Sequence, residues 1–220
     1  MTHIMLSGIR LNFFMLFILF LVNDISAQKI NKTEKDSLRI VLDKMKEQDQ
    51  RYRWQVMLAE TDENKLDSLK NKISFENRMK RLNDVAAGKI KLDSGINRLL
   101  RKEIERLDSL NFIKFYQITK KYGYPSYKRT GSTAVDVLTI HFVDSVHFSL
   151  LFSLFENELK KGNMNSVDYA QWYDRSMLHV GKKQLYGEYN KEYPCVENIE
   201  QTNIARKKIG LKKIKTNNCR

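Results

Sequence analysis

The chain has 220 residues and a formal net charge of +13 at pH 7. This length suits one medium-sized domain, or one domain with a helical extension, and it allows a sizeable buried core. The positive charge suits contact with acidic glycans, lipid head groups or nucleic acid, but solvated lysine-rich helix faces are the simpler explanation.

Residues 1–27 have the layout of a secretory signal peptide. Arg10 precedes an apolar run over residues 11–22, and small residues at 25–27 supply a cleavage site. The run is shorter than the roughly 20 apolar residues that a membrane span needs, although an uncleaved anchor remains an alternative. We therefore predict a mature protein that is exported, periplasmic or secreted, without a membrane span. Export argues against intracellular nucleic acid as a partner.

Residues 28–95 are predicted to form a charged helical segment. A helix capped by Asp36 or Ser37 is expected first, because apolar residues recur at three- and four-residue spacing through 38–57. Residues 63–87 carry only a narrow apolar stripe among many charges. Such a stripe is typical of a solvated helix that packs against one neighbour.

Residues 96–220 are predicted to form a helical core domain. Ser94 can cap a helix that ends at Gly123, because Pro125 lies just beyond. Further helices are expected over residues 132–143, 145–161, 166–180 and 196–209. Clear caps and only two prolines predict an all-α, multi-helix fold. A short β-hairpin near Tyr186 is the alternative to a loop.

Two ionisable residues share the apolar faces of their predicted helices. His141 follows Leu138 at helical spacing, and Asp174 follows Ala170 on another stripe. A buried carboxylate needs a partner, because an isolated buried charge is very costly. The partners considered for Asp174 are Arg175, His141, Arg53 and the Tyr186 hydroxyl.

The pair His141 and Asp174 has a catalytic and a structural interpretation. In the catalytic one, His141 is a general acid or base that Asp174 orients, while Arg175 holds an anion. In the structural one, the same groups form a buried clasp that fixes helix register. The sequence contains no nucleophile motif, so in the catalytic interpretation water or a substrate group would have to attack. Buried pairs of this kind occur for both reasons, and we favour the clasp.

No metal or cofactor site is predicted. HFVDSVH places His141, Asp144 and His147 three residues apart. Over a helix these directions fan through about 120°, so convergence on one ion is not expected. The two cysteines, Cys195 and Cys219, either close a loop or remain free thiols.

Four short motifs occur in a defined order: KKYGYP at 120–125, HFVD at 141–144, YDR at 173–175 and GKKQLYG at 181–187. In this order they resemble a bacterial family of uncharacterised, often exported proteins that is catalogued only as a domain of unknown function. The resemblance covers nearly the whole mature chain and implies no reaction. It implies one constellation, made of Tyr122, Gly123, Pro125, His141, Asp144, Asp174, Arg175, Gln184, Tyr186 and Gly187. That family commonly has Thr-Gln after the last motif, where this chain has Glu188-Tyr189.

These observations predict an exported helical protein with a polar cleft that binds a small molecule or an envelope component. The expected ligand-binding residues are Tyr122, Asp144, Arg175, Gln184 and Tyr186. One alternative is a hydrolase or transferase that uses His141 and Asp174. The other is a structural module that binds an acidic glycan or lipid surface through Arg206, Lys207, Lys208, Lys212 and Lys213.

Overall fold

The computed structural model describes residues 30–189 and 194–217, so the predicted signal peptide and Cys219 lie outside it. Within these ranges the all-α prediction is confirmed. The described chain forms helices, and its residues around Tyr186 form no strand; a single isolated bridge joins Gln184 to Val196. The helices are α2 (Lys32–Leu58), α3 (Glu63–Lys72), α4 (Phe75–Ala86), α5 (Ser94–Tyr122), α6 (Tyr127–Thr130), α7 (Ala134–Thr139), α8 (Ser145–Lys160), α9 (Ser166–His179) and α10 (Ile199–Lys208).

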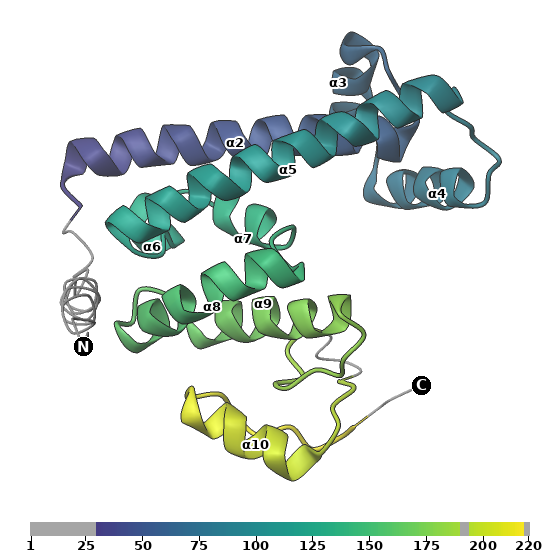
Figure 1. The fold of residues 1–220 in the computed structure, drawn as a ribbon. Coiled ribbons are helices and arrows are strands. Elements are labelled where there is room, and N and C mark those ends of the chain that lie inside the picture. Colours follow the sequence, from purple (N-terminus) through teal and green to yellow (C-terminus); the bar gives the residue numbers. More distant parts are fainter. Residues whose placement is uncertain (1–29, 190–193, 218–220) are drawn as a thin grey trace, which may run out of the picture.

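The helices are arranged in layers (Figure 1). The long helices α2 and α5 run antiparallel across one side of the molecule, and α3 and α4 lie at one end of this pair. The short helices α6 and α7 lie beneath the pair, followed by the hairpin of α8 and α9. Helix α10 lies beyond α9, on the side away from α2.

Local capping explains several helix ends. Gly123 ends α5 with φ of 78°, as predicted, and the Asp144 side chain accepts hydrogen bonds at the start of α8. The first helix begins earlier than expected. Asn31, not Asp36 or Ser37, caps α2, because its side chain and that of Glu34 form a reciprocal capping box.

Two predicted helices are divided or shortened. The stretch 63–87 is two helices, because α3 stops at Ile73 and Ser74 starts α4 with its hydroxyl. The helix expected over 132–143 is only α7, which ends at Thr139. His141 therefore lies after α7 and not on it. Contrary to the sequence prediction, its side chain does not share a helix face with Leu138.

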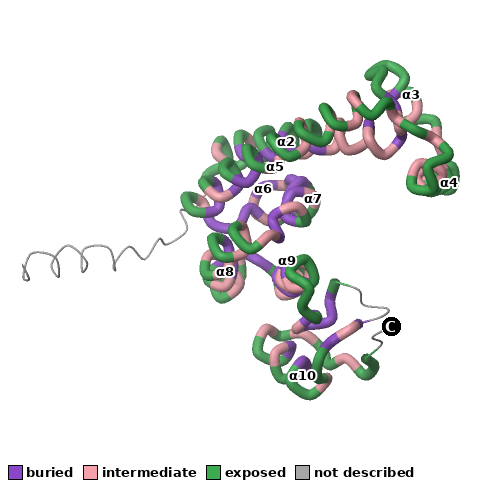
Figure 2. Tube along the Cα trace, turned by 45° about the vertical axis from the view of Figure 1, so that its right-hand side comes forward, coloured by how far each residue is buried: buried purple, intermediate pink, exposed green. Residues whose placement is uncertain are grey.

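The main hydrophobic core joins α2, α5, α7, α8 and α9 (Figure 2). Leu38, Leu42 and Met45 of α2 are buried in it, together with Phe115 of α5 and Phe155 of α8. The first half of α2 thus contributes to the same core as residues 96–220. The charged segment that stands apart from this core is α3 and α4, at the far end of the α2–α5 pair.

Two further features concern the chain as a whole. Across the described helices, none combines the length and the apolar composition that crossing a membrane requires. Cys195 is disulfide-bonded. The second cysteine of the sequence, Cys219, lies outside the described residues.

Candidate functional site

Asp174 faces the interior of the molecule, as predicted, and its side chain holds the loop that follows α9. The residue is fully buried, and its carboxylate accepts hydrogen bonds from the backbone N–H groups of Leu185, Tyr186 and Glu188 at 2.8, 2.8 and 2.7 Å. Burial raises the pKa of the Asp174 carboxyl, and these N–H groups oppose the rise. The partners are backbone amides and not the side chains that the sequence suggested. These contacts favour the structural interpretation of Asp174.

Arg206 secures the same loop from α10. Its guanidinium donates to the backbone oxygen atoms of Tyr186 and Lys212 and lies 2.9 Å from a carboxylate oxygen of Glu188. Both charged side chains are buried, with 6% and 5% of their surface exposed. Arg206 is therefore part of the fold and does not belong to an exposed basic surface, whereas Lys207, Lys208, Lys212 and Lys213 are exposed.

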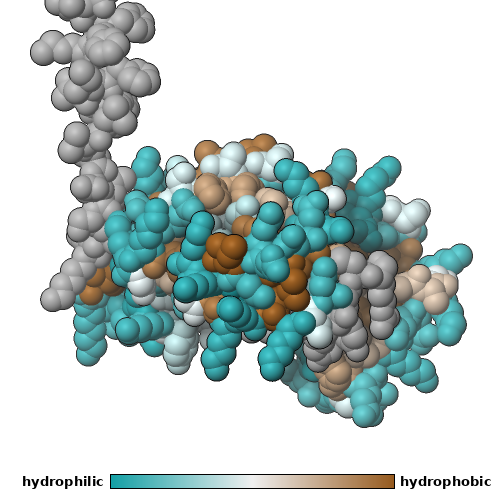
Figure 3. Space-filling model, turned by 90° about the horizontal axis from the view of Figure 1, so that it is seen from below, coloured by the Kyte–Doolittle hydropathy of each residue, from teal (hydrophilic) through white to brown (hydrophobic). Residues whose placement is uncertain are grey.

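Seen from below, hydrophilic side chains cover most of the molecule, with small apolar patches between them (Figure 3).

His141 lies in a second polar cluster, between α2, α5 and α9. Its Nε2 atom is 3.7 Å from Oδ2 of Asp49, a residue of α2 that is almost fully buried. Arg53 forms ion pairs with both Asp49 and Asp108. Burial, and then the positive charge of Arg53, lowers the pKa of His141 to about 4, against the opposing effect of Asp49. His141 and Asp174 thus have different partners.

The other predicted ligand residues are distributed over the molecule. Tyr122 ends α5, where its carbonyl oxygen accepts from Arg129. Asp144 caps α8, and one of its carboxylate oxygens lies 2.6 Å from Nδ1 of His147. His141 contacts Asp49 instead and does not join this pair. Gln184 is buried and accepts from the N–H of Tyr189, and Tyr186 packs in the core against Tyr169 and Tyr173. The structure does not bring these side chains to one cleft.

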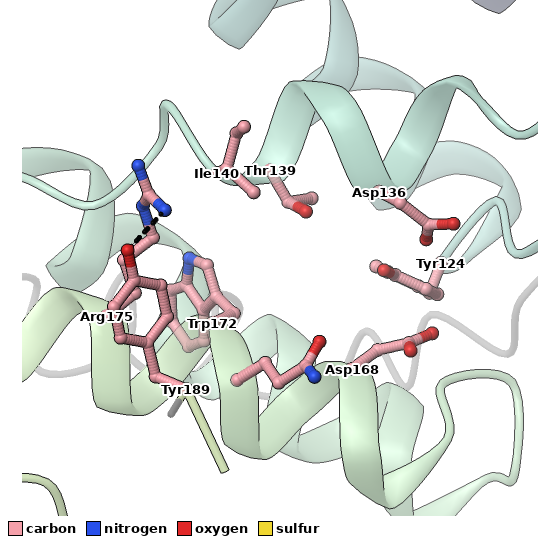
Figure 4. Close-up of a pocket in the computed structure, with 9 residues that line it drawn as sticks. Tyr124, Asp136, Thr139, Ile140, Asp168, Trp172, Arg175 and Tyr189 are labelled. Carbon is pink, nitrogen blue, oxygen red and sulfur yellow. Dashed lines mark hydrogen bonds between the residues drawn. The ribbon is translucent and has the colours of Figure 1, made fainter. Parts of the chain in front are cut away.

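A cleft does lie between α7 and α9, and we name it the α7–α9 cleft (Figure 4). Its volume is about 350 Å³, which falls in the range of small-molecule sites. Of the predicted ligand residues only Arg175 lines it. The lining residues are Tyr124, Asp136, Thr139, Ile140, Asp168, Gln171, Trp172, Arg175 and Tyr189.

The indole of Trp172 forms a rigid wall of this cleft. Its Nε1–H donates to the carbonyl oxygen of Phe142 at 2.9 Å, and its ring packs against Phe148 and Phe155. Only 4% of Trp172 is exposed. The cleft therefore has a fixed aromatic side, while Ile140 and Gln171 are exposed at its edges.

One end of the cleft, the carboxylate end, consists of Asp136, Asp168 and Tyr124. Burial raises the pKa of the Asp168 carboxyl, and the negative charge of Asp136 raises it further. Burial and the same two carboxylates raise the pKa of the Tyr124 hydroxyl well above its ordinary value. The Tyr124 hydroxyl is therefore protonated at neutral pH and can donate a hydrogen bond.

The other end of the cleft, the guanidinium end, consists of Arg175 and Tyr189. The guanidinium of Arg175 lies over the ring of Tyr189, 5.2 Å from its centroid, and donates to the Tyr189 hydroxyl at 3.0 Å. These two contacts hold the guanidinium beside the cleft. Within the described ranges, no carboxylate forms an ion pair with Arg175.

Sequence reasoning missed most of the cleft. Asp136 and Asp168 each lie in the first turn of a helix, where acidic residues commonly stabilise the helix dipole. Tyr124 lies within the KKYGYP motif, but neither Tyr124 nor Trp172 was among the predicted ligand residues. Their convergence depends on where the fold places α7 relative to α9, and no local pattern in the sequence encodes that arrangement.

The comparisons with known proteins add no relative. No family model matches the chain, and no significant match was found among curated proteins or solved structures. The resemblance suggested by the four motifs therefore remains a prediction, and the function must be inferred from the site.

Proposed function

We propose that this protein is an exported binding protein that holds a small polar molecule in the α7–α9 cleft. The proposed export rests on the signal-peptide pattern of residues 1–27. The observation that carries the binding function is the Tyr124 hydroxyl. Tyr124 is 1% exposed, yet its hydroxyl has no hydrogen-bond partner in residues 30–189 or 194–217 and turns into the cleft (Figure 4).

The Tyr124 hydroxyl is not fully enclosed by protein and lines the cleft. A ligand in the cleft can therefore accept its hydrogen bond. The cleft also offers a fixed aromatic wall at Trp172 and an exposed side-chain amide at Gln171. A few placed polar groups beside an apolar wall are typical of small-molecule sites.

A hydrolase or transferase that uses His141 and Asp174 has less support from the geometry. The Asp174 carboxylate is occupied by backbone N–H groups, and His141 contacts Asp49. Catalysis by these residues stays an untested prediction, and we favour binding.

The binding proposal can be tested with one substitution placed in two clefts. Gln171 is an exposed residue of the α7–α9 cleft, and Gln201 is an exposed residue of a separate cleft between α9 and α10. A panel of small polar metabolites is screened against the purified exported protein by ligand-observed NMR. We expect binding that Gln171→Trp abolishes and Gln201→Trp leaves unchanged.

Two results would contradict the proposal. One is a panel in which no compound binds the wild-type protein. The other is binding that survives Gln171→Trp, which would place the ligand elsewhere; loss with Gln201→Trp would then locate it between α9 and α10. Thermal unfolding of both variants checks that each is folded.

A further inference from the structure

The α7–α9 cleft carries charges that the protein does not neutralise. No lysine, arginine or histidine in the described ranges forms an ion pair with Asp136 or Asp168, and no cationic group contributes to the raised pKa of Asp168. Lysine and arginine outnumber acidic residues by 39 to 26 in the chain. Two neighbouring carboxylates without a cation are therefore unexpected in so basic a protein.

The two carboxylates of this end repel each other. Water screens this repulsion less at Asp168, which is half-buried, than at Asp136, which is exposed. Asp168 receives one hydrogen bond, from Nδ2 of Asn165 at 2.6 Å, and Asp136 receives none from the described residues. A bound ammonium group would relieve the repulsion at the carboxylate end. The buried Tyr124 hydroxyl between these carboxylates adds a neutral hydrogen-bonding group at the same place (Figure 4).

The guanidinium end of the cleft is suited to a ligand group of the opposite charge, an anion. Arg175 is positioned by Tyr189 and has no anionic partner among the described side chains, so it can bind a carboxylate or another small anion. Trp172 and Ile140 lie between the two ends and offer apolar contact (Figure 4). The three parts of the cleft thus differ in sign and polarity along its length.

We infer that the ligand is a small dipolar ion, with an ammonium group bound by Asp136 and Asp168, an anionic group bound by Arg175, and a short apolar part against Trp172 and Ile140. Free amino acids and ω-amino acids belong to this chemical class. The inference rests on the proposed binding function and specifies what the cleft selects.

The test compares charged and half-charged probes by isothermal titration calorimetry on the purified exported protein. The dipolar probes are glycine, 4-aminobutanoate and 6-aminohexanoate, a series that also measures the distance between the two ends. The half-charged probes are hexylamine and hexanoate. We expect the best dipolar probe to bind at least about tenfold more tightly than either half-charged probe, because it makes both charge-assisted contacts.

Two variants should separate the ends of the cleft. Asp136→Asn should weaken binding of the dipolar probe and of hexylamine at least about tenfold and leave hexanoate unchanged. Arg175→Gln should weaken the dipolar probe and hexanoate and leave hexylamine unchanged. Glu47→Gln and Arg98→Gln change exposed residues on α2 and α5 and serve as matched controls without effect.

The inference is overturned if hexylamine or hexanoate binds as tightly as the best dipolar probe, if no dipolar probe binds, or if Asp136→Asn and Arg175→Gln affect all probes alike. These outcomes remain distinct from failure of the binding function. If another compound binds and Gln171→Trp abolishes its binding, the cleft is a ligand site and only the ligand class is wrong.

Discussion

Helix α9 carries two aspartates whose carboxylates have opposite environments. Near its C-terminal end, Asp174 is fully buried and accepts three backbone hydrogen bonds, so its charge is satisfied by the fold. Near its N-terminal end, Asp168 is only partly buried but lies beside Asp136 with no cationic partner in the described chain. Burial alone therefore does not identify a binding residue. The lack of a partner is the more informative signal.

The same contrast separates other charged groups. Arg206 lies in the interior and is paired with Glu188 and two backbone oxygen atoms, whereas Arg175 lies at a cleft and forms no ion pair with the described residues. A charge that is paired within the fold should contribute to stability, whereas a charge without a partner should contribute to ligand binding.

The largest effect is expected for Asp174→Asn. The substitution removes the charge and turns an amide toward three N–H donors, so the free energy of unfolding should fall by about 3–5 kcal/mol. Asp168→Asn is the matched control on the same helix and should change stability by about 1 kcal/mol or less. Urea denaturation of both variants provides the measurement. Equal losses of unfolding free energy for the two variants would mean that Asp174 and Asp168 do not differ in their contribution to the fold.

A somewhat smaller loss is expected for Arg206→Met. This change leaves the buried Glu188 carboxylate without its guanidinium, which should lower the unfolding free energy by about 2–4 kcal/mol. Lys207→Met, at the exposed neighbouring position, should cost about 0.5 kcal/mol or less. If both variants unfold at the same urea concentration, Arg206 does not hold the loop after α9.

Acid should destabilise the protein through His141. Its pKa is about 4 in the fold and 6.5 in the unfolded chain, so the unfolded state binds the proton first as pH falls. The stability that the neutral imidazole contributes is complete above pH 6.5 and is lost between pH 6.5 and 4, by about 3 kcal/mol. The charges facing His141 are Asp49 and Arg53 from α2 and Arg175 from α9.

The His141 prediction is measured as a difference in pH slope. Unfolding free energies of the wild type and of His141→Asn are compared from pH 7 to pH 4. The wild type should lose more stability than the variant over this interval. Parallel curves would mean that His141 does not titrate as its surroundings require.

Local sequence signals predicted much of the secondary structure. Gly123 and Asp144 have the expected roles at helix ends, because capping depends on neighbouring residues. The inward orientation of Asp174 also followed from helical spacing and is confirmed. The break at Ser74 and the early end of α7 were missed, since the apolar spacing continues through both points.

The candidate site was much less predictable than the fold. Arg175 was expected to bind a ligand and does line the α7–α9 cleft, but Tyr124 and Asp136 of the same cleft lie 51 and 39 residues away from it in sequence. Those residues meet because the fold places α7 across a cleft from α9, and a single sequence does not show such an arrangement. Gln184 and Tyr186 were placed in the same cleft by their motif, whereas the fold buries them on the other side of α9.

The central claim is that the unsatisfied charges of the α7–α9 cleft hold a dipolar ligand. The two tryptophans, Trp172 at the cleft and Trp54 on α2, provide a direct measurement with an internal reference. In protein labelled with nitrogen-15 tryptophan, titration with the tightest-binding of the three dipolar probes should move the indole resonance of Trp172 in a saturable way and leave that of Trp54 in place. Movement of neither resonance, or equal movement of both, would contradict the claim.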